Sequence, residues 1–384
     1  MKVLIPAMEK RSALAAARSL GRKGIEVIGC SEDKRNPGFF SKYCAKKHLY
    51  RSPCLDVAGY IDDVFEIIKK EKPDLFMPVN EETLLPLLEK RAELEGLVNL
   101  PLPQNDILEK AFNKKKATEI AASAGIPCPK IVKDPSSSNF PLIARPRLSR
   151  QIEDNKVVSE KLFYINSLKE AESIDPNRYF LQEYFPGSGY GFYALFDNGR
   201  PLAYFMMKRL HEVPFTGGPS SLRESVYDEE LKEYRLNILK ELKWHGLAMV
   251  EFRRDEKDGS FKFIEINGRL WGSLALSICS GADFPYLLCQ MVNGDKVAET
   301  FDYKKGIKGR WLAGDVSYLL SVLFKKKVDK RPSRPKALIQ FFNFFQKNTC
   351  YDYFVKDDLK PAFVNLWLLF LKPFKKIISW KQRD

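Results

Sequence analysis

The chain has 384 residues, of which 45% are hydrophobic and 29% are charged. This length exceeds what one ordinary hydrophobic core needs and predicts two or three domains, since domains hold roughly 100–200 residues. The composition lies near globular averages, which excludes a disordered or fibrous protein. No apolar run approaches the ~20 residues of a membrane-spanning helix, and the N-terminus lacks the features of a secretory leader. We therefore expect a soluble, cytoplasmic protein.

The formal net charge of +14 is distributed very unevenly along the chain. Residues 303–384 contain 19 Lys and Arg against 6 Asp, a net charge of +13, whereas the first 302 residues are nearly neutral. The seven cysteines are widely spread and form no C-x-x-C pair, which is typical of reduced thiols and not of disulfides or a zinc site. Any function of the basic charge therefore belongs to the C-terminal quarter.

The first 105 residues alternate between strand-like and helix-like segments. The predicted strands are 2–6, 26–30 and 74–79, and the predicted helices are 11–24 and 60–70. This alternation predicts an α/β domain with a parallel sheet, Rossmann-like, over residues 1–105. The chain has no G-x-G-x-x-G turn and no G-x-x-x-x-G-K-[ST] motif, which excludes a nicotinamide or flavin site and a P-loop. Asn80-Glu81-Glu82 either lines a site for a small polar substrate or is simply an acidic helix start.

Residues 106–298 follow a strand-rich pattern with few helices. The predicted strands are 142–145, 179–184, 192–196, 202–207, 247–252 and 261–266, and the predicted helices are 106–124 and 229–242. Strands that outnumber helices in this way predict an α+β domain built on an antiparallel sheet.

The strongest chemical pattern is a hairpin expected around the turn signal Asp258-Gly259. Folding about that turn places Glu251 within a residue or two of Glu265 on the opposite strand, and the two-residue period puts Asn267 on the same face. Two carboxylates this close repel each other unless a cation lies between them, and hard oxygen ligands suit Mg²⁺ bound to nucleotide phosphates. From spacing alone, a hairpin with one solvated polar face is the alternative.

Arg269 follows the hairpin, and Ser273 is the expected N-cap of a helix over residues 274–282. A guanidinium just beyond metal ligands is suited to holding a transferring phosphoryl group or an acyl-phosphate oxygen. An ordinary surface arginine at the start of a helix is the alternative.

Glu251 and the run from Glu265 to Ser273 (E-I-N-G-R-L-W-G-S) resemble the metal and phosphate signature of the ATP-grasp superfamily, closest to its carbamoyl-phosphate-synthase-like and carboxylate–amine ligase branch. Three upstream segments resemble further family elements, in the family's order: 113–129 with its G-I-P-x-P turn, 140–146 and 181–187. The resemblance spans about residues 106–295. It implies a pre-ATP-grasp domain over 1–105, an ATP-grasp domain over 106–298 and a basic, mostly helical C-terminal region over 299–384.

The resemblance also implies roles for individual residues. Mg²⁺, or Mn²⁺ in its place, would be held by Glu251, Glu265 and Asn267. ATP would be bound through its phosphates by Lys114 and Arg145, and through adenine by Gln182, Glu183, Tyr184 and Phe185. Arg269 would stabilise the transferred phosphoryl group, and Arg209, beside a Gly/Ser turn at 216–221, would lie on the acceptor side of the site. A plain turn is the alternative at 216–221, and His211 is expected to be structural.

The family generally has Lys where Arg145 stands, glycines in the loop matching 148–155, and often an acidic ribose ligand where this chain has Ser188-Gly189. Nevertheless, the resemblance implies a Mg-ATP-dependent ligase, which activates a small-molecule carboxylate as an acyl phosphate and joins it to an amine. A non-catalytic ATP-binding or regulatory protein is the alternative.

The C-terminal quarter combines lysine clusters, such as 325–327 and 375–376, with aromatic and apolar runs at 341–345 and 365–374. This pattern fits a helical appendage whose aromatic residues pack on the body, or a helix at an anionic membrane surface, which would make the protein a membrane-surface adaptor at the inner membrane face. Nucleic acid is disfavoured because no RNA- or DNA-binding motif is present. Homo-oligomerisation is left open.

Overall fold

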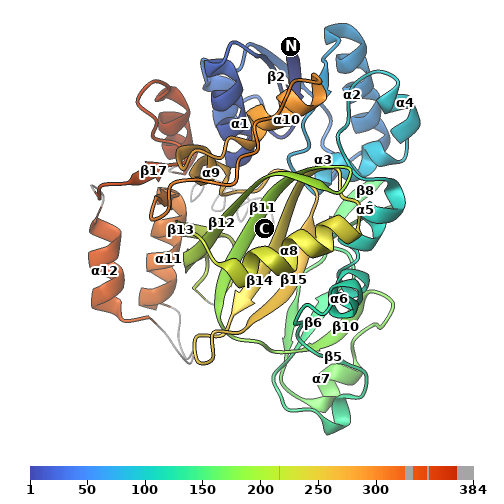
Figure 1. Ribbon diagram of the computed structural model, residues 1–384, viewed down its shortest axis with the longest axis vertical. Coiled ribbons are helices and arrows are strands. Elements are labelled where there is room, and N and C mark those ends of the chain that lie inside the picture. Colours follow the sequence, from blue (N-terminus) through green and yellow to red (C-terminus); the bar gives the residue numbers. More distant parts are fainter. Residues whose placement is uncertain (216, 325–331, 344–345, 370–384) are drawn as a thin grey trace, which may run out of the picture.

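The computed structural model describes residues 1–215, 217–324, 332–343 and 346–369 (Figure 1). Its first part is a four-stranded parallel sheet in the order β3-β2-β1-β4, which confirms the predicted parallel sheet and adds one strand, β3, that was not predicted. The strands are β1 (Lys2–Ile5), β2 (Glu26–Ser31), β3 (Lys46–Leu49) and β4 (Leu75–Phe76), and the helices are α1 (Arg11–Arg22), α2 (Val57–Glu71), α3 (Glu81–Leu88) and α4 (Arg91–Glu95). The strand expected over 74–79 is only two residues long, and Pro78, which has no N–H to donate, follows shortly after it.

A small antiparallel sheet in the order β5-β10-β6-β9 follows, at the lower right of Figure 1. Its strands are β5 (Ile131–Val132), β6 (Leu142–Pro146), β9 (Phe163–Ile165) and β10 (Tyr179–Glu183). The same stretch of chain forms the helices α5 (Asn105–Phe112), α6 (Lys114–Ser123) and α7 (Leu168–Glu172) and the hairpin β7 (Arg150–Glu153) and β8 (Lys156–Ser159). Of these, α7 packs on β9, whereas β7 contacts α3 of the first part. The single helix expected over 106–124 is wrong. Asn113 has an extended backbone there, and its side chain accepts from Lys116 N, so it ends α5 and caps α6.

The largest sheet has seven strands in the order β15-β14-β11-β12-β13-β16-β17 and lies at the centre of Figure 1. Its first five strands are antiparallel neighbours: β11 (Ser188–Asp197), β12 (Arg200–Glu212), β13 (Ser220–Val226), β14 (Gly246–Arg254) and β15 (Phe261–Asn267). Three further helices are α8 (Glu229–Glu241), α9 (Leu274–Cys279) and α10 (Phe284–Val292), and α8 crosses the front of this sheet in the view. The antiparallel sheet expected from the strand-rich pattern is confirmed.

The C-terminal part of the chain contributes to this central sheet. β16 (Lys308–Arg310) pairs with β13, and β17 (Thr349–Tyr351) pairs with β16. The helices α11 (Leu312–Phe324) and α12 (Arg334–Phe342) pack beside each other at the sheet's edge. The lysine clusters at 325–327 and 375–376 lie outside the described residues, and the domain boundaries stay predictions. None of the described helices has the length and apolarity to cross a membrane.

Three arginine–aspartate pairs join α1 to the C-terminal part; we call them the arginine seam. They are Arg11–Asp352, Arg18–Asp358 and Arg22–Asp357, with N–O distances of 2.7, 2.8 and 2.7 Å. The middle pair is buried on both sides, and the Arg18 guanidinium also donates to three backbone carbonyls. The seam therefore fixes α1 against the segment that continues from β17.

Candidate active site

A cavity of about 480 Å³ lies between the small sheet, the central sheet and the start of α1. Residues from all the predicted site segments line it, namely Lys114, Arg145, Gln182, Glu183, Tyr184, Phe185, Arg209, Glu251, Glu265 and Arg269. Asn267, the remaining predicted ligand, is buried next to Glu265. Segments up to 155 residues apart in the sequence thus converge on one site.

The carboxylates expected to face each other do so directly. Glu251 on β14 is the register partner of Glu265 on β15, and the connecting loop runs from Asp255 to Ser260, longer than a two-residue turn. Asn267 Nδ2 donates to Glu265 Oε1 at 3.1 Å, which places the amide on the same face. Two carboxylates and one amide therefore meet at one point of the cavity wall.

Cationic side chains surround these carboxylates. Arg209 Nη2 donates to Glu251 Oε2 at 2.6 Å, and Lys114 Nζ and Arg145 Nη2 lie 3.3 and 3.6 Å from Glu265 Oε2. Burial raises the pKa of Glu265, but Lys114 and Arg145 outweigh it and lower that pKa to about 2. For Glu251 burial dominates and raises the pKa, with Arg209 opposing. The Glu265 carboxylate is thus firmly ionised, whereas burial still disfavours the charged form of Glu251.

Arg145 is held by three different groups at once. Its Nη1 donates to Gln182 Oε1 at 3.2 Å and to the Ile264 carbonyl at 3.1 Å, while Nη2 faces Glu265. Gln182 in turn donates to the Pro129 carbonyl at 2.9 Å. The planar guanidinium therefore connects the small sheet to β15, which a single ammonium cannot do with the same geometry.

The segment predicted to bind adenine forms the end of β10 and the residues after it. Glu183 pairs with Lys262 at 2.6 Å, and the same ammonium lies 4.4 Å from the Phe185 ring centroid. Tyr184 is 43% exposed and makes an edge contact with Tyr164, whose ring centroid is 5.7 Å away. This part of the cavity wall is aromatic and open, and a flat ring can stack there.

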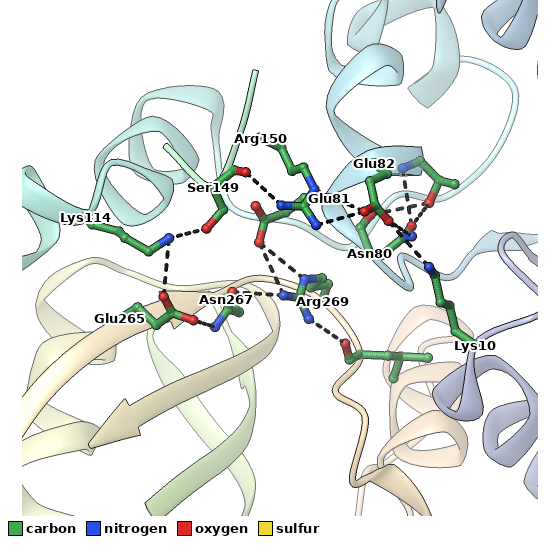
Figure 2. A network of polar contacts seen from close by, with 12 residues as sticks. Lys10, Asn80, Glu81, Glu82, Lys114, Ser149, Arg150, Glu265, Asn267 and Arg269 are labelled. Atoms are coloured by element: carbon green, nitrogen blue, oxygen red, sulfur yellow. Dashed lines mark hydrogen bonds and ion pairs between the residues drawn. The ribbon is translucent and has the colours of Figure 1, made fainter. Parts of the chain in front are cut away.

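Polar contacts continue from Glu265 to Glu81 and Glu82 on α3, as Figure 2 shows. Arg269 Nη2 donates to Asn267 Oδ1 at 3.2 Å and lies 3.3 Å from Glu81 Oε1. Arg150 and Glu82 pair at 2.9 Å, and these residues line a second cavity of about 190 Å³. Asn80 caps α3, which matches the acidic helix start, and Glu81 and Glu82 also reach the site.

Two expectations about neighbouring residues need correction or refinement. Ser273 stands at the N-cap position of α9, as expected, but its side chain makes no capping hydrogen bond; its Oγ lies 2.7 Å from Tyr193 Oη. In the predicted anion-binding turn, Thr216 lies outside the described residues, and the Gly218 carbonyl accepts a hydrogen bond from Arg209 at 3.2 Å. His211 is buried and stacks on Tyr318 with ring centroids 4.0 Å apart, a packing role.

Sequence reasoning did not single out Arg11 and Tyr193, which also line the cavity. Tyr193 stacks on Trp271 with centroids 4.3 Å apart, and residues like these are indistinguishable from core aromatics in a strand pattern. Arg11 opens the helix after the first parallel strand, at the edge of the sheet where ligands of such folds bind. This position could have identified Arg11 as a candidate ligand-binding residue from the sequence.

One family model matches part of the chain. Residues 176–314 match the sequence model of the family described as ATP-grasp in the biosynthetic pathway with Ter operon. No curated protein is similar enough in sequence to match the chain.

Several solved structures share the fold. Rhizobium etli pyruvate carboxylase is 16% identical, with a TM-score of 0.57, covering 76% of this chain and 27% of its own. Campylobacter jejuni biotin carboxylase, in complex with β,γ-ATP, is 16% identical, with a TM-score of 0.61 and coverage of 80% and 74%. The L-amino acid ligase of Bacillus licheniformis is 19% identical, with a TM-score of 0.56 and coverage of 76% and 73%. These likenesses establish the fold.

Proposed function

We propose that the chain is an ATP-grasp enzyme, a Mg²⁺- and ATP-dependent ligase that activates a carboxylate as an acyl phosphate and joins it to an amine. The observation that carries this proposal is the directly opposed pair Glu251 and Glu265, with Asn267 beside them and cations on every side. The names of structural neighbours, a ligase and carboxylases, support an ATP-dependent ligase in general.

The donor atoms suit Mg²⁺. Two carboxylates and an amide oxygen are hard ligands of the kind that Mg²⁺ prefers, so Glu251, Glu265 and Asn267 would hold it together with phosphate oxygens of the nucleotide. Within the described part of the chain, no three His, Cys, Asp or Glu side chains form a metal-binding group by themselves, so Asn267 and the nucleotide have to contribute. The chemistry that Mg²⁺ supplies, when bound, is neutralisation of charge on the phosphate oxygens.

In the first step, Lys114 and Arg145 hold the phosphates of ATP in line with the substrate carboxylate. A carboxylate oxygen attacks the γ-phosphorus, the bond to the bridging oxygen of ADP breaks, and an acyl phosphate forms. Arg269, which contacts Asn267 and Glu81, would stabilise the transferred phosphoryl group, and Arg209, which contacts Glu251, would act on the acceptor side.

In the second step, the amine nitrogen attacks the acyl carbon. The bond to the phosphate oxygen breaks, phosphate leaves, and the nitrogen gives up a proton as the amide forms. The protein contributes positioning and charge, so no nucleophilic serine or cysteine is required.

Thermal unfolding with and without MgATP tests the site, using wild type, Glu265→Ala and a matched control, Glu299→Ala. Glu299 pairs with Arg200 and does not line the cavity. We expect MgATP to raise the melting temperature of wild type and Glu299→Ala but not of Glu265→Ala. Wild type should also release ADP with hydroxylamine, which traps acyl phosphates as hydroxamates, in the presence of a suitable acid. No shift in wild type at millimolar MgATP would contradict the proposal.

The same experiment separates the ligase from a non-catalytic ATP-binding protein. The feature that favours the alternative is the loop 148–155, which lacks glycines and whose Ser149 and Arg150 already contact Lys114 and Glu82. Stabilisation by MgATP without ADP release for any acid would support binding without catalysis.

A membrane-surface role for the C-terminal part is a second candidate. Val316, Leu320 and Phe324 recur every four residues on α11 and are 45%, 49% and 72% exposed. Such a stripe beside a lysine-rich sequence is suited to an anionic lipid surface. We expect the protein to sediment with phosphatidylserine-containing vesicles at low salt, and Leu320→Ser with Phe324→Ser to weaken this. Equal sedimentation with neutral vesicles would contradict the idea.

A further inference from the structure

Arg11 occupies a part of the active-site cavity that the proposed steps do not use. Its Nη1 donates to Asp352 Oδ2 at 2.7 Å, and its side chain is 14% exposed. Its Nε and Nη2 make no hydrogen bond to any residue that the structure describes. These two nitrogens form one edge of the guanidinium, and that edge matches the two oxygens of a carboxylate or phosphate.

The charge around Arg11 is unbalanced. Asp352 uses one oxygen for Arg11 and the other for Arg223, which is fully buried. Two guanidinium groups therefore share a single carboxylate, and one positive charge is left over. An uncompensated cation at a largely buried position is costly unless an anion joins it.

The surroundings keep space open beside Arg11. The Trp311 ring covers one face of the guanidinium, with its centroid 4.1 Å from the Arg11 Cζ atom. Gly272 lies at the edge, and a Cβ atom there would come within 3.2 Å of Arg11 Nη2. The Trp311 ring thus fixes the orientation of the guanidinium, and Gly272 lies next to Nη2, one of its two nitrogens without a hydrogen bond.

The same cavity connects Arg11 to the catalytic carboxylates. Tyr193 and Ser273 line it and are hydrogen-bonded to each other at 2.7 Å. Gly272 and Ser273 follow Arg269 in the chain, and Arg209 lines the same wall. A molecule bound by its reacting carboxylate near Arg209 and Arg269 can therefore extend toward Arg11.

Resting on the proposed function, we propose that the acid activated by this enzyme carries a second anionic group, a carboxylate or a phosphate, and that Arg11 binds that group. Arg11 is then a specificity-determining residue: it selects the acid and takes no part in phosphoryl transfer. The substrate class is a dianionic acid whose two charged ends are separated by a short spacer.

Hydroxamate formation with MgATP and hydroxylamine tests this without knowledge of the amine. The acids are matched sets: butanoate against pentanedioate, and butanoate against 4-phosphonobutanoate, which separate a carboxylate from a phosphate-like second group. The proteins are wild type, Arg11→Gln, Gly272→Ala and Arg22→Gln. Arg22 lies on the same helix and pairs with Asp357, away from the cavity lining.

Wild type and Arg22→Gln should prefer a dianionic acid by about tenfold or more in kcat/KM, as expected for a charge-assisted bidentate contact. Arg11→Gln should lose this preference because its KM for the dianionic acid rises, and Gly272→Ala should weaken the preference while keeping Arg11. Equal use of both kinds of acid by wild type, or a preference that survives in Arg11→Gln, would overturn the inference.

Failure of the ligase reaction itself is distinguishable. If wild type forms no hydroxamate with any acid, the proposed function fails, and Arg11 is then tested by binding alone. Millimolar pentanedioate or 4-phosphonobutanoate should still raise the melting temperature of wild type and Arg22→Gln more than butanoate does. No such difference, or the same difference in Arg11→Gln, would overturn the assignment of Arg11.

Discussion

Arg209 on β12 reaches Glu251 on β14 across the intervening strand β11, with 2.6 Å between Nη2 and Oε2. Gly189 on β11 makes this crossing feasible, because a Cβ atom there would lie only 2.7 Å from Arg209 Cδ. Gly189 therefore has a structural reason in this chain: it makes room for an arginine that neutralises a proposed metal ligand.

Gly189→Ala should displace Arg209 and lower hydroxamate formation by at least about tenfold, since one positioned charge contact is worth that much or more. Binding of MgATP, measured by thermal shift, should change little. Ser188→Ala, next to it, removes only an exposed hydrogen bond to Glu256 and should behave as wild type. If Gly189→Ala is as active as wild type, Arg209 does not have to pass over Gly189 to reach Glu251.

Arg145→Lys tests whether this chain needs the several donors of a guanidinium at a position where ATP-grasp proteins generally have lysine. The lysine keeps a positive charge near Glu265 but cannot also bond to Gln182 and Ile264, so unfolding free energy should fall by about 1 kcal/mol. Stabilisation by MgATP should persist in Arg145→Lys and be lost in Arg145→Met. Urea denaturation and thermal shift measure the two effects, and equal behaviour of the two variants would contradict the prediction.

The arginine seam predicts that two substitutions on α1 lower the free energy of unfolding by very different amounts. Arg18→Ala leaves Asp358 buried without its partner and should cost about 3–5 kcal/mol of unfolding free energy. Arg22→Ala breaks a pair whose side chains are 38% and 40% exposed and should cost less than about 1 kcal/mol. Urea unfolding of both variants provides the comparison, and similar midpoints would mean that the seam is weaker than its burial indicates.

His245 predicts a pH dependence away from the active site. Burial lowers its pKa from the ordinary 6.5, although Asp197 lies 3.3 Å away and opposes the shift. The unfolded chain therefore binds this proton at a higher pH than the folded protein, so the stability linked to His245 is present above pH 6.5 and is lost as the pH falls through that range.

When the pH is lowered from about 7.5 to about 5.5, the range in which histidine titrates, the melting temperature of His245→Gln should fall less than that of wild type. Lys243→Gln, two residues away, removes no group that titrates in this range and serves as the control. An unchanged pH dependence in His245→Gln would show that the histidine is not the source.

The sequence predicted the sheet of the first part and the opposed carboxylates because both depend on local periodicity. Residues 3–6 and 27–30 are apolar runs, and Glu251 and Glu265 flank one hairpin, so counting residues places them within a residue or two of each other; the exact pairing also depends on a bulge beside Glu251. The Asn113 break was misjudged because its flanking segments have good helical patterns, whereas the interruption depends on a single side-chain cap.

Long-range partners were beyond the reach of pattern reasoning. β13 has alternating polar residues, and its Arg223 is buried only because Asp352 arrives from 129 residues later. Arg11 likewise depends on Asp352 and Trp311 for its position in the cavity. When the partner of a charged residue lies far away in the sequence, no local pattern around that residue predicts the contact.

The arginine seam also has a consequence for the order in which the protein can fold during synthesis. Arg18 and Asp358 are separated by 340 residues, so α1 leaves the ribosome long before the aspartates that neutralise its arginines have been made. The first sheet can collapse early around its apolar strands, but one face of α1 has to stay solvated until the last part of the chain arrives. A ribosome that stalls before residue 352 would therefore hold a nascent chain whose first helix still lacks its final contacts.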